Sequence, residues 1–199
     1  VRLAGLSKRI NIETGDSAGQ PFPGEFDLII GIEVAHHIEN KKALLANLKS
    51  SLAPGGRLVL ADCLSPRVDA LSPATGSWTL SEANYARTMA EAGLAITRAV
   101  DCSAGIANCL TGDDIDATMR LLLARGMSPA KLELVRRVHD GWLNFGKALA
   151  SGSLRYLLLQ FEASNAPQDR LIAANRAALT GARPFGSGAM KQETPRVRA

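Results

Sequence analysis

Apolar and polar positions follow two distinct periods in the first third of the chain. Arg9–Thr14 alternates between apolar and polar residues, which predicts a half-buried strand. Phe26–Val34 is a nearly continuous apolar run, typical of a strand buried on both faces of a parallel sheet. Leucines then recur at helical spacing over Lys41–Leu52, and a second apolar run, Arg57–Cys63, follows a Pro-Gly-Gly turn. These patterns predict a strand–helix–strand unit with a right-handed crossover.

The remainder of the chain continues this alternation of elements. The expected elements are a Pro/Ser-rich loop over 65–77, a helix over 80–93, a strand over 94–101, mostly helix over 113–151 with a break near "GMSP", a strand over 154–163 and a helix over 167–180. From Gly181 onward the sequence is typical of a tail or linker. We therefore predict an α/β domain with a mainly parallel sheet over residues 1–165, and a helix plus linker over 166–199.

Composition narrows the possible functions. Among 199 residues, 46% are hydrophobic and 21% charged, which suits a globular domain. The net charge of +4 is dispersed and only 5% of residues are aromatic, so no nucleic-acid partner is expected. The sequence has no run of about 18 apolar residues, so it does not predict a membrane span. The three cysteines lack the spacing of a zinc site or a disulfide framework, which favours a cytoplasmic protein.

Polar residues follow three of the expected strands. They are Asp16 after the first strand, the stretch from Glu33 to His37 after the second, and the stretch from Asp62 to Ser65 after the third. Ligands of open α/β sheets bind at the carboxyl ends of the strands. We therefore expect these three stretches to open into one crevice, with the adjacent histidines His36 and His37 in it.

Two resemblances give this crevice a function. The order "GD…PFPGEFDLIIGIEVAHHI…LLANLKSSLAPGGRLVLAD" resembles the second half of a class I S-adenosylmethionine-dependent methyltransferase. The segments "LSKRINIETGDSA", "DCSAGIANCL" and "NFGKALASGSLRYLLLQ" resemble C-methyltransferase domains of type I polyketide synthases and extend the match from Leu6 to Gln160. The resemblance implies a partial Rossmann-like sheet with a helical lid over about 113–151, because no segment matches the family's first two strands or its Gly-rich loop.

The resemblance also implies how S-adenosylmethionine is held. Its acidic residue after the third strand contacts the adenine, and Asp16 with Ser17 takes that place. The turn after the next strand lines the methionine side of the cofactor, and Ile32, Glu33 and Val34 form it. An Asx-turn in a Gly-rich loop is the alternative role for Asp16.

The implied reaction is methylation of the α-carbon of a β-ketoacyl thioester, carried on the phosphopantetheine arm of an acyl carrier protein between other synthase domains. Family members use a histidine base paired with an acidic residue, and here His36 is the base and Asp62 its partner. Family members often have glutamate at this acidic position, where Asp62 has a shorter side chain. Glu33 is the substitute partner, because it lies close to His36 in the chain. A histidine whose pKa lies near neutrality can remove such an acidic C–H proton. Proximity and orientation supply much of the remaining acceleration, and no metal is needed.

Other roles for these residues stay open. His37, Asn108 and Asn144 are candidates for binding the acyl substrate, whereas packing, capping and turn roles are their structural alternatives. His36 can also pack beside the cofactor without acting as a base. At the level of the whole chain, a small-molecule O- or N-methyltransferase and a non-catalytic remnant of a methyltransferase are the two alternative functions.

Overall fold

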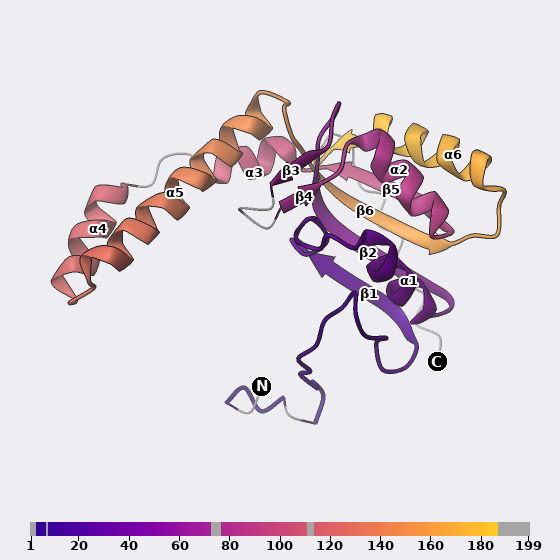
Figure 1. Cartoon of the computed structure of the whole chain (residues 1–199), viewed down its shortest axis with the longest axis horizontal. Coiled ribbons are helices and arrows are strands. Elements are labelled where there is room, and N and C mark those ends of the chain that lie inside the picture. The colour runs from indigo at the N-terminus through magenta and orange to yellow at the C-terminus, as the bar shows by residue number, and fades with distance from the viewer. Residues whose placement is uncertain (1–2, 7, 73–76, 111–113, 187–199) are drawn as a thin grey trace.

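The computed structural model describes residues 3–6, 8–72, 77–110 and 114–186 and places them around one five-stranded sheet, shown in Figure 1. The strand order is β1-β2-β6-β5-β7. In that order the strands are Phe26–Ile32, Leu52–Leu64, Arg155–Ala163, Leu94–Asp101 and Arg183–Pro184. The strand–helix–strand unit predicted from periodicity is present, since α1 (Lys41–Ser50) connects the parallel pair β1 and β2.

In the five-stranded sheet β1, β2, β5 and β7 run in one direction, as expected for a mainly parallel sheet, and β6 is the exception. β6 runs antiparallel to both β2 and β5. After β5 ends at Asp101, the chain leaves through three helices and re-enters at Arg155, beside that same end, where Cys102 N donates to Tyr156 O. Because the chain does not cross over to the opposite ends of the strands before β6 begins, β6 must run back along β5 in the antiparallel direction.

Four expectations about secondary structure were wrong. The predicted Pro-Gly-Gly turn lies within β2, which already begins at Leu52. Arg9–Thr14 forms no strand: Ile10 and Ile12 are 44% and 72% exposed, and no strand of the described chain pairs with this segment. Within the expected loop over 65–77, β3 (Ala70–Ser72) begins a hairpin with β4 (Ser77–Thr79). β7 lies in the expected tail, where it pairs with the end of β5. A segment with an alternating pattern becomes a strand only if another strand pairs with it, and the pattern does not say which segment that is.

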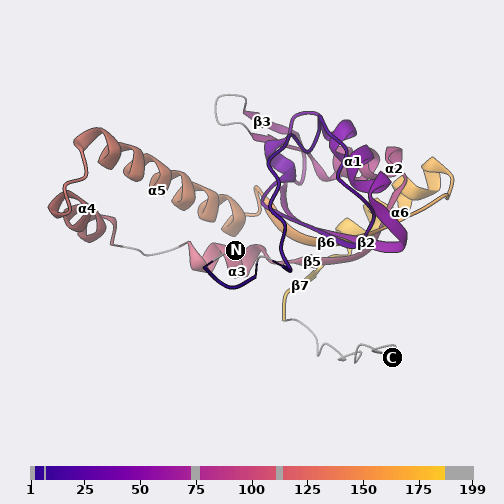
Figure 2. The same ribbon diagram turned by 90° about the horizontal axis from the view of Figure 1, so that it is seen from below.

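The main core lies on one face of the sheet. Figure 2 shows α1, α2 (Glu82–Glu91) and α6 (Gln168–Thr180) on that side. The side chains that the sheet contributes to it include several with no solvent exposure, namely Leu58, Leu64, Leu157, Leu159 and Phe161. We call this the covered face.

Within the part of the chain that the structure describes, the opposite face is covered only near the carboxyl end of β2. There α3 (Ser103–Cys109) and α5 (Pro129–Ala150) pack in a small cluster with Cys63 and Tyr156. We call it the open face, because the alternate β1 residues Phe26, Leu28, Ile30 and Ile32 are 39% to 61% exposed. Burial of β1 on both faces was therefore a wrong prediction for the described chain.

The predicted helical segment over 113–151 consists of α4 (Ile115–Ala124) and α5, while Asp113 lies outside the described residues. α4 packs on α5 and buries none of its own side chains, and both helices extend away from the sheet in Figure 1. None of the helices in the described ranges is both long enough and apolar enough to span a bilayer. The helices are confirmed, and a lid function stays a prediction.

Candidate functional site

His36 is carried into the protein by a short turn after β1. Glu33 extends the pairing with β2, because its N–H donates to Ala61 O at 3.0 Å. The chain then reverses direction at Glu33, which adopts φ 57, a left-handed conformation that is uncommon for a residue with a side chain. One turn of 3-10 helix, η1 (Ala35–His37), follows and buries His36 to 8% exposure.

The structure brings His36 and Asp62 together. His36 Nδ1 lies 2.5 Å from Asp62 Oδ1, and Asp62 is only 2% exposed at the carboxyl end of β2. The same oxygen accepts the N–H of Cys63 at 2.9 Å. A buried carboxylate without partners would be strongly destabilising, so these contacts stabilise the folded site and fix the ring orientation. The parallel pairing of β1 and β2 accounts for the contact, because it places the two strand ends side by side.

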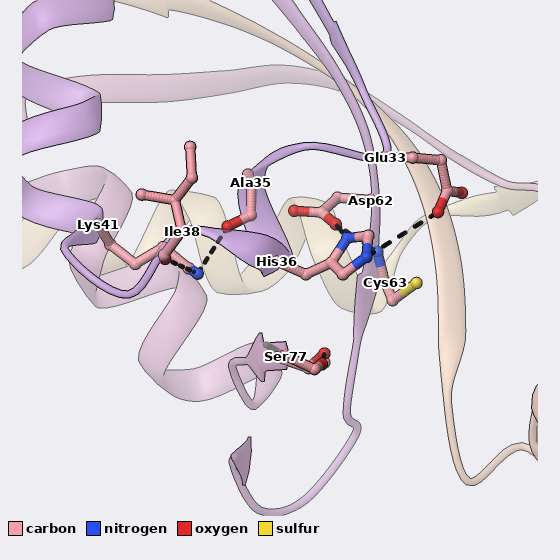
Figure 3. A network of polar contacts seen from close by, with 9 residues as sticks. Glu33, Ala35, His36, Ile38, Lys41, Asp62, Cys63 and Ser77 are labelled. Carbon is pink, nitrogen blue, oxygen red and sulfur yellow. Dashed lines mark hydrogen bonds and ion pairs between the residues drawn. The ribbon is translucent and has the colours of Figure 1, made fainter. Parts of the chain in front are cut away.

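Nε2 of His36 points toward Glu33. Its distance to Glu33 Oε2 is 4.0 Å, and Figure 3 shows Glu33 and Asp62 on different sides of the imidazole ring. With the Nδ1 proton donated to Asp62, Nε2 carries the free lone pair of a neutral imidazole. Asp62 is therefore the residue that sets the tautomer, and Glu33 lies near the nitrogen available for chemistry.

Lys41 stabilises the turn and was not predicted from the sequence. Its Nζ donates to Ala35 O at 2.6 Å and to Ile38 O at 2.5 Å, which closes η1 from the side of α1 (Figure 3). Burial lowers the pKa of Lys41 to about 8, although the negative charge of Asp62 acts in the opposite direction. A cation in the first turn of a helix opposes the helix dipole. The position of Lys41 in the first turn of α1 was therefore a sequence signal that this lysine has a role outside its own helix.

Two residues next to the pair of His36 and Asp62 come from the open face. Cys63 and Tyr156 are 6% and 7% exposed, and the Tyr156 hydroxyl hydrogen-bonds the carboxylate of Glu33. Burial, together with the nearby carboxylates, raises the pKa of the Cys63 thiol and of the Tyr156 phenol. Periodicity could predict that Cys63 is buried, but it could not place β6, and hence Tyr156, beside it.

The predicted cofactor residues lie in the loop before β1 and at the end of β1. Asp16 is exposed and its Oδ1 accepts the N–H of Ala18 at 2.9 Å, so the Asx-turn considered as its alternative role is formed. The carbonyl oxygen of Ser17 accepts from Asn47 Nδ2 at 2.9 Å, which ties this loop to α1. Ile32 and Val34, at 61% and 43% exposure, flank Glu33 at the end of β1. A role in cofactor binding stays a prediction for these residues.

The predicted substrate residues are more dispersed. The ring of His37 lies 4.0 Å from that of His36, at a tilt of 47°. Asn108 and Asn144 are exposed residues of α3 and α5, the two helices that pack together beside Cys63. Substrate binding stays a prediction for all three.

Sequence comparison relates the chain to methyltransferases. Residues 6–99 match the model of a methyltransferase domain family. Over 191 residues, or 92% of the chain, it is 31% identical to the polyketide synthase ThaQ of Burkholderia thailandensis, of which it spans 8%. Over 74 residues, or 35% of the chain, it is 35% identical to a probable tocopherol O-methyltransferase of rice, of which this match spans 20%. These matches thus cover only a small part of the relatives' length.

Solved structures give the same relationship at the level of the fold. The O-methyltransferase from a trans-AT polyketide synthase of Brevibacillus brevis, in complex with S-adenosyl-L-homocysteine, matches with a TM-score of 0.79 and 26% identity. The StiE O-methyltransferase, residues 942–1257, matches with a TM-score of 0.75 and 30% identity. Each match covers 92% of this chain and 60% of the other.

Proposed function

We propose that this chain, whose residues 6–99 match the model of a methyltransferase domain family, transfers a methyl group from S-adenosylmethionine to a polyketide acyl intermediate. The chain has the Rossmann-like class I methyltransferase fold. The observation that carries the proposal is the buried pair of His36 and Asp62 at the carboxyl ends of neighbouring parallel strands. The polyketide setting is supported by the likeness to ThaQ and to the solved synthase methyltransferases.

In the proposed mechanism, His36 Nε2 removes the proton of the acceptor group. Asp62 holds the Nδ1 proton at 2.5 Å, so it keeps the ring in the reactive tautomer and stabilises the imidazolium that forms. S-adenosylmethionine supplies the electrophilic methyl group. The exposed side chains of Asp16, Ile32 and Val34 offer one carboxylate and two apolar surfaces, which suit the polar and apolar parts of that cofactor.

The acceptor atom has two candidates. The sequence resemblance favours the α-carbon of a β-ketoacyl thioester, whereas the names of the solved polyketide synthase relatives favour an oxygen. A histidine base suits both, because each acceptor must lose one proton before or during transfer. We rank the oxygen acceptor first, because two relatives that cover 92% of the chain are O-methyltransferases, and the carbon acceptor second.

The proposed partner is an acyl carrier protein within a larger synthase. A polyketide intermediate is held on a phosphopantetheine arm, so the proposed site receives a tethered chain instead of a freely diffusing molecule. This proposal is supported by the 31% identity to a polyketide synthase over 92% of the chain.

The test is methyl transfer to acyl chains on a carrier protein, followed by mass spectrometry. A β-hydroxyacyl and a β-ketoacyl thioester are offered separately with S-adenosylmethionine, and the site of methylation distinguishes oxygen from carbon. We expect His36→Ala to lower transfer by about 100-fold or more, because one general base contributes on that scale. Its affinity for S-adenosylmethionine, measured by calorimetric titration, should stay within a few-fold.

The matched control is His139→Ala, which removes a histidine of α5 and should leave transfer unchanged. Retention of full activity in His36→Ala would disprove the assignment of the base. Methylation of amines or phenols alone, with neither thioester accepted, would disprove the polyketide substrate.

A further inference from the structure

Three side chains bring three different kinds of metal-binding atom close together. The ligand atoms of Glu33, His36 and Cys63 all lie within 4.8 Å of one another. They come from the turn after β1, from η1 and from the end of β2, and Figure 3 shows them gathered in one place. The spacing of the cysteines gave no hint of this group, because Cys63 reaches it through strand pairing.

The orientation of His36 is suited to a metal ligand. Histidines that bind metals usually donate their second ring N–H to a carboxylate, which fixes the tautomer and makes the other nitrogen a better donor. Asp62 occupies that position on Nδ1, at 2.5 Å. Nε2 therefore presents its lone pair on the side of Glu33.

The distances require only small movements. His36 Nε2 and Glu33 Oε2 are 4.0 Å apart. Ligand bonds of about 2.0 to 2.3 Å place the donor atoms of a tetrahedral zinc ion roughly 3.3 to 3.8 Å apart. Glu33 has a side chain that is 47% exposed and can exchange its contact with Tyr156 for a bound ion, whereas His36 and Cys63 are fixed by burial.

We propose that Glu33, His36 and Cys63 form a Zn²⁺ site with one open coordination position. A carboxylate oxygen, an imidazole nitrogen and a thiolate sulfur together suit zinc, whereas Mg²⁺ and Ca²⁺ prefer oxygen ligands alone. The two negative charges of the bound carboxylate and thiolate balance the charge of the ion, which favours binding at a partly buried position.

Binding is coupled to one proton. The Cys63 thiol must lose its proton to solvent as the Zn–S bond forms, since the thiolate is the ligand. Zinc affinity should therefore increase with pH.

Zinc would also switch the site off. The lone pair of His36 Nε2 cannot accept a proton while it is bonded to zinc. This consequence rests on the proposed function, whereas the metal site itself does not. The predicted result is reversible inhibition of methyl transfer by Zn²⁺.

The first test uses Co²⁺ as a spectroscopic substitute for Zn²⁺ in the full chain. We expect one equivalent to bind, with visible bands of a tetrahedral site and a near-ultraviolet band from thiolate-to-cobalt charge transfer, both displaced by Zn²⁺. Cys63→Ser should remove the near-ultraviolet band and weaken binding at least tenfold. The matched control is Cys109→Ser, which changes an exposed cysteine and should behave as the unaltered chain does.

Circular dichroism checks that Cys63→Ser is folded, and Cys63→Ala is the second variant, since it introduces no polar group into the buried cluster around Cys63. Absence of cobalt bands, or a charge-transfer band that persists without Cys63, would overturn the proposal.

The second test measures methyl transfer with and without Zn²⁺. Inhibition should be reversed by a chelator, and Cys63→Ser, measured against its own zinc-free rate, should require at least tenfold more zinc for inhibition. Equal inhibition of both proteins would rule out Cys63 as a ligand. If cobalt binds as expected but neither protein transfers methyl groups, the metal site stands and the proposed function fails.

Discussion

The two faces of the sheet contain similar residues in very different environments. On the covered face, Leu157 and Phe161 have no solvent exposure, whereas on the open face Ile30 and Ile32 are 59% and 61% exposed. All four lie on strands and alternate with residues that point the other way. A hydrophobic run therefore predicts a strand, but only the placement of helices decides which of its faces is buried.

The candidate site lies at the boundary between these faces. Asp62 is on the covered face and contacts His36 there, while its neighbour in sequence, Cys63, belongs to the cluster on the open face. Consecutive strand residues point to opposite sides, so the two faces supply different chemical groups to one imidazole ring. The comparison of the faces can be tested by substitutions on each.

The largest difference should appear when an apolar side chain is removed from each face. Phe161→Ala should lower the free energy of unfolding by about 3 to 5 kcal/mol, because it leaves a cavity in the covered core. Ile30→Ala should cost about 1 kcal/mol or less, since its side chain is 59% exposed. Urea unfolding followed by circular dichroism measures both, with Phe161→Leu as a milder variant.

Equal losses for Phe161→Ala and Ile30→Ala would break the comparison. They would mean that the open face is buried in solution. Repeating the unfolding of Ile30→Ala at several protein concentrations would then identify burial against a second copy, because dimer stability depends on concentration.

The next effect concerns the carboxylate at the end of the covered face. Asp62→Asn should lower methyl transfer by about 100-fold or more, because the neutral amide cannot stabilise the imidazolium. Glu162→Gln is the control, since Glu162 lies on β6 in an exposed pair with Arg57. Steady-state rates with the preferred thioester measure both; an undiminished rate in Asp62→Asn would remove Asp62 from the mechanism.

The smallest effect is a pH dependence due to Lys41. Its folded pKa of about 8 lies below its ordinary value of 10.5, so between these values the unfolded chain binds more protons. The contribution of Lys41 to the free energy of unfolding should therefore increase as pH rises from 8 toward 10.5. Because the side chain is only partly buried, we expect a gain of about 1 kcal/mol.

Lys41→Met should lack this gain, so the difference between the two proteins at pH 7.5 and pH 10 isolates it. Lys42→Met, which changes a neighbouring lysine that is 81% exposed, is the control. A constant difference between the unaltered chain and Lys41→Met would show that Lys41 keeps an ordinary pKa.

Periodicity predicted much of the fold because local pattern and final structure agree there. α1, α2, α5 and α6 lie where helical spacing placed them, and β1, β5 and β6 where apolar runs did. β2 includes the expected run over 57–63 but begins at Leu52, across the predicted turn. The direction of β6, the hairpin of β3 and β4, and the absence of a strand at Arg9–Thr14 depend on pairing partners far along the chain. Such contacts have no local signal.

The site was predictable to the same extent. The pairing of His36 with Asp62 follows from the rule that parallel strands end at one edge, so sequence reasoning could place the two together. Cys63 and Tyr156 join the site through the opposite face, and Lys41 through a bond from a helix to the carbonyl groups of a turn. These contacts depend on three-dimensional packing that no spacing encodes.

The left-handed backbone at Glu33 sets stability against chemistry at a single residue. A glycine would adopt φ 57 without the steric cost of a side chain, which is roughly 1 kcal/mol for an ordinary residue. It would also delete the carboxylate that faces His36 Nε2 at 4.0 Å. Glycine at this position would therefore make the folded chain more stable. The strain at Glu33 is offset only if its carboxylate has a function.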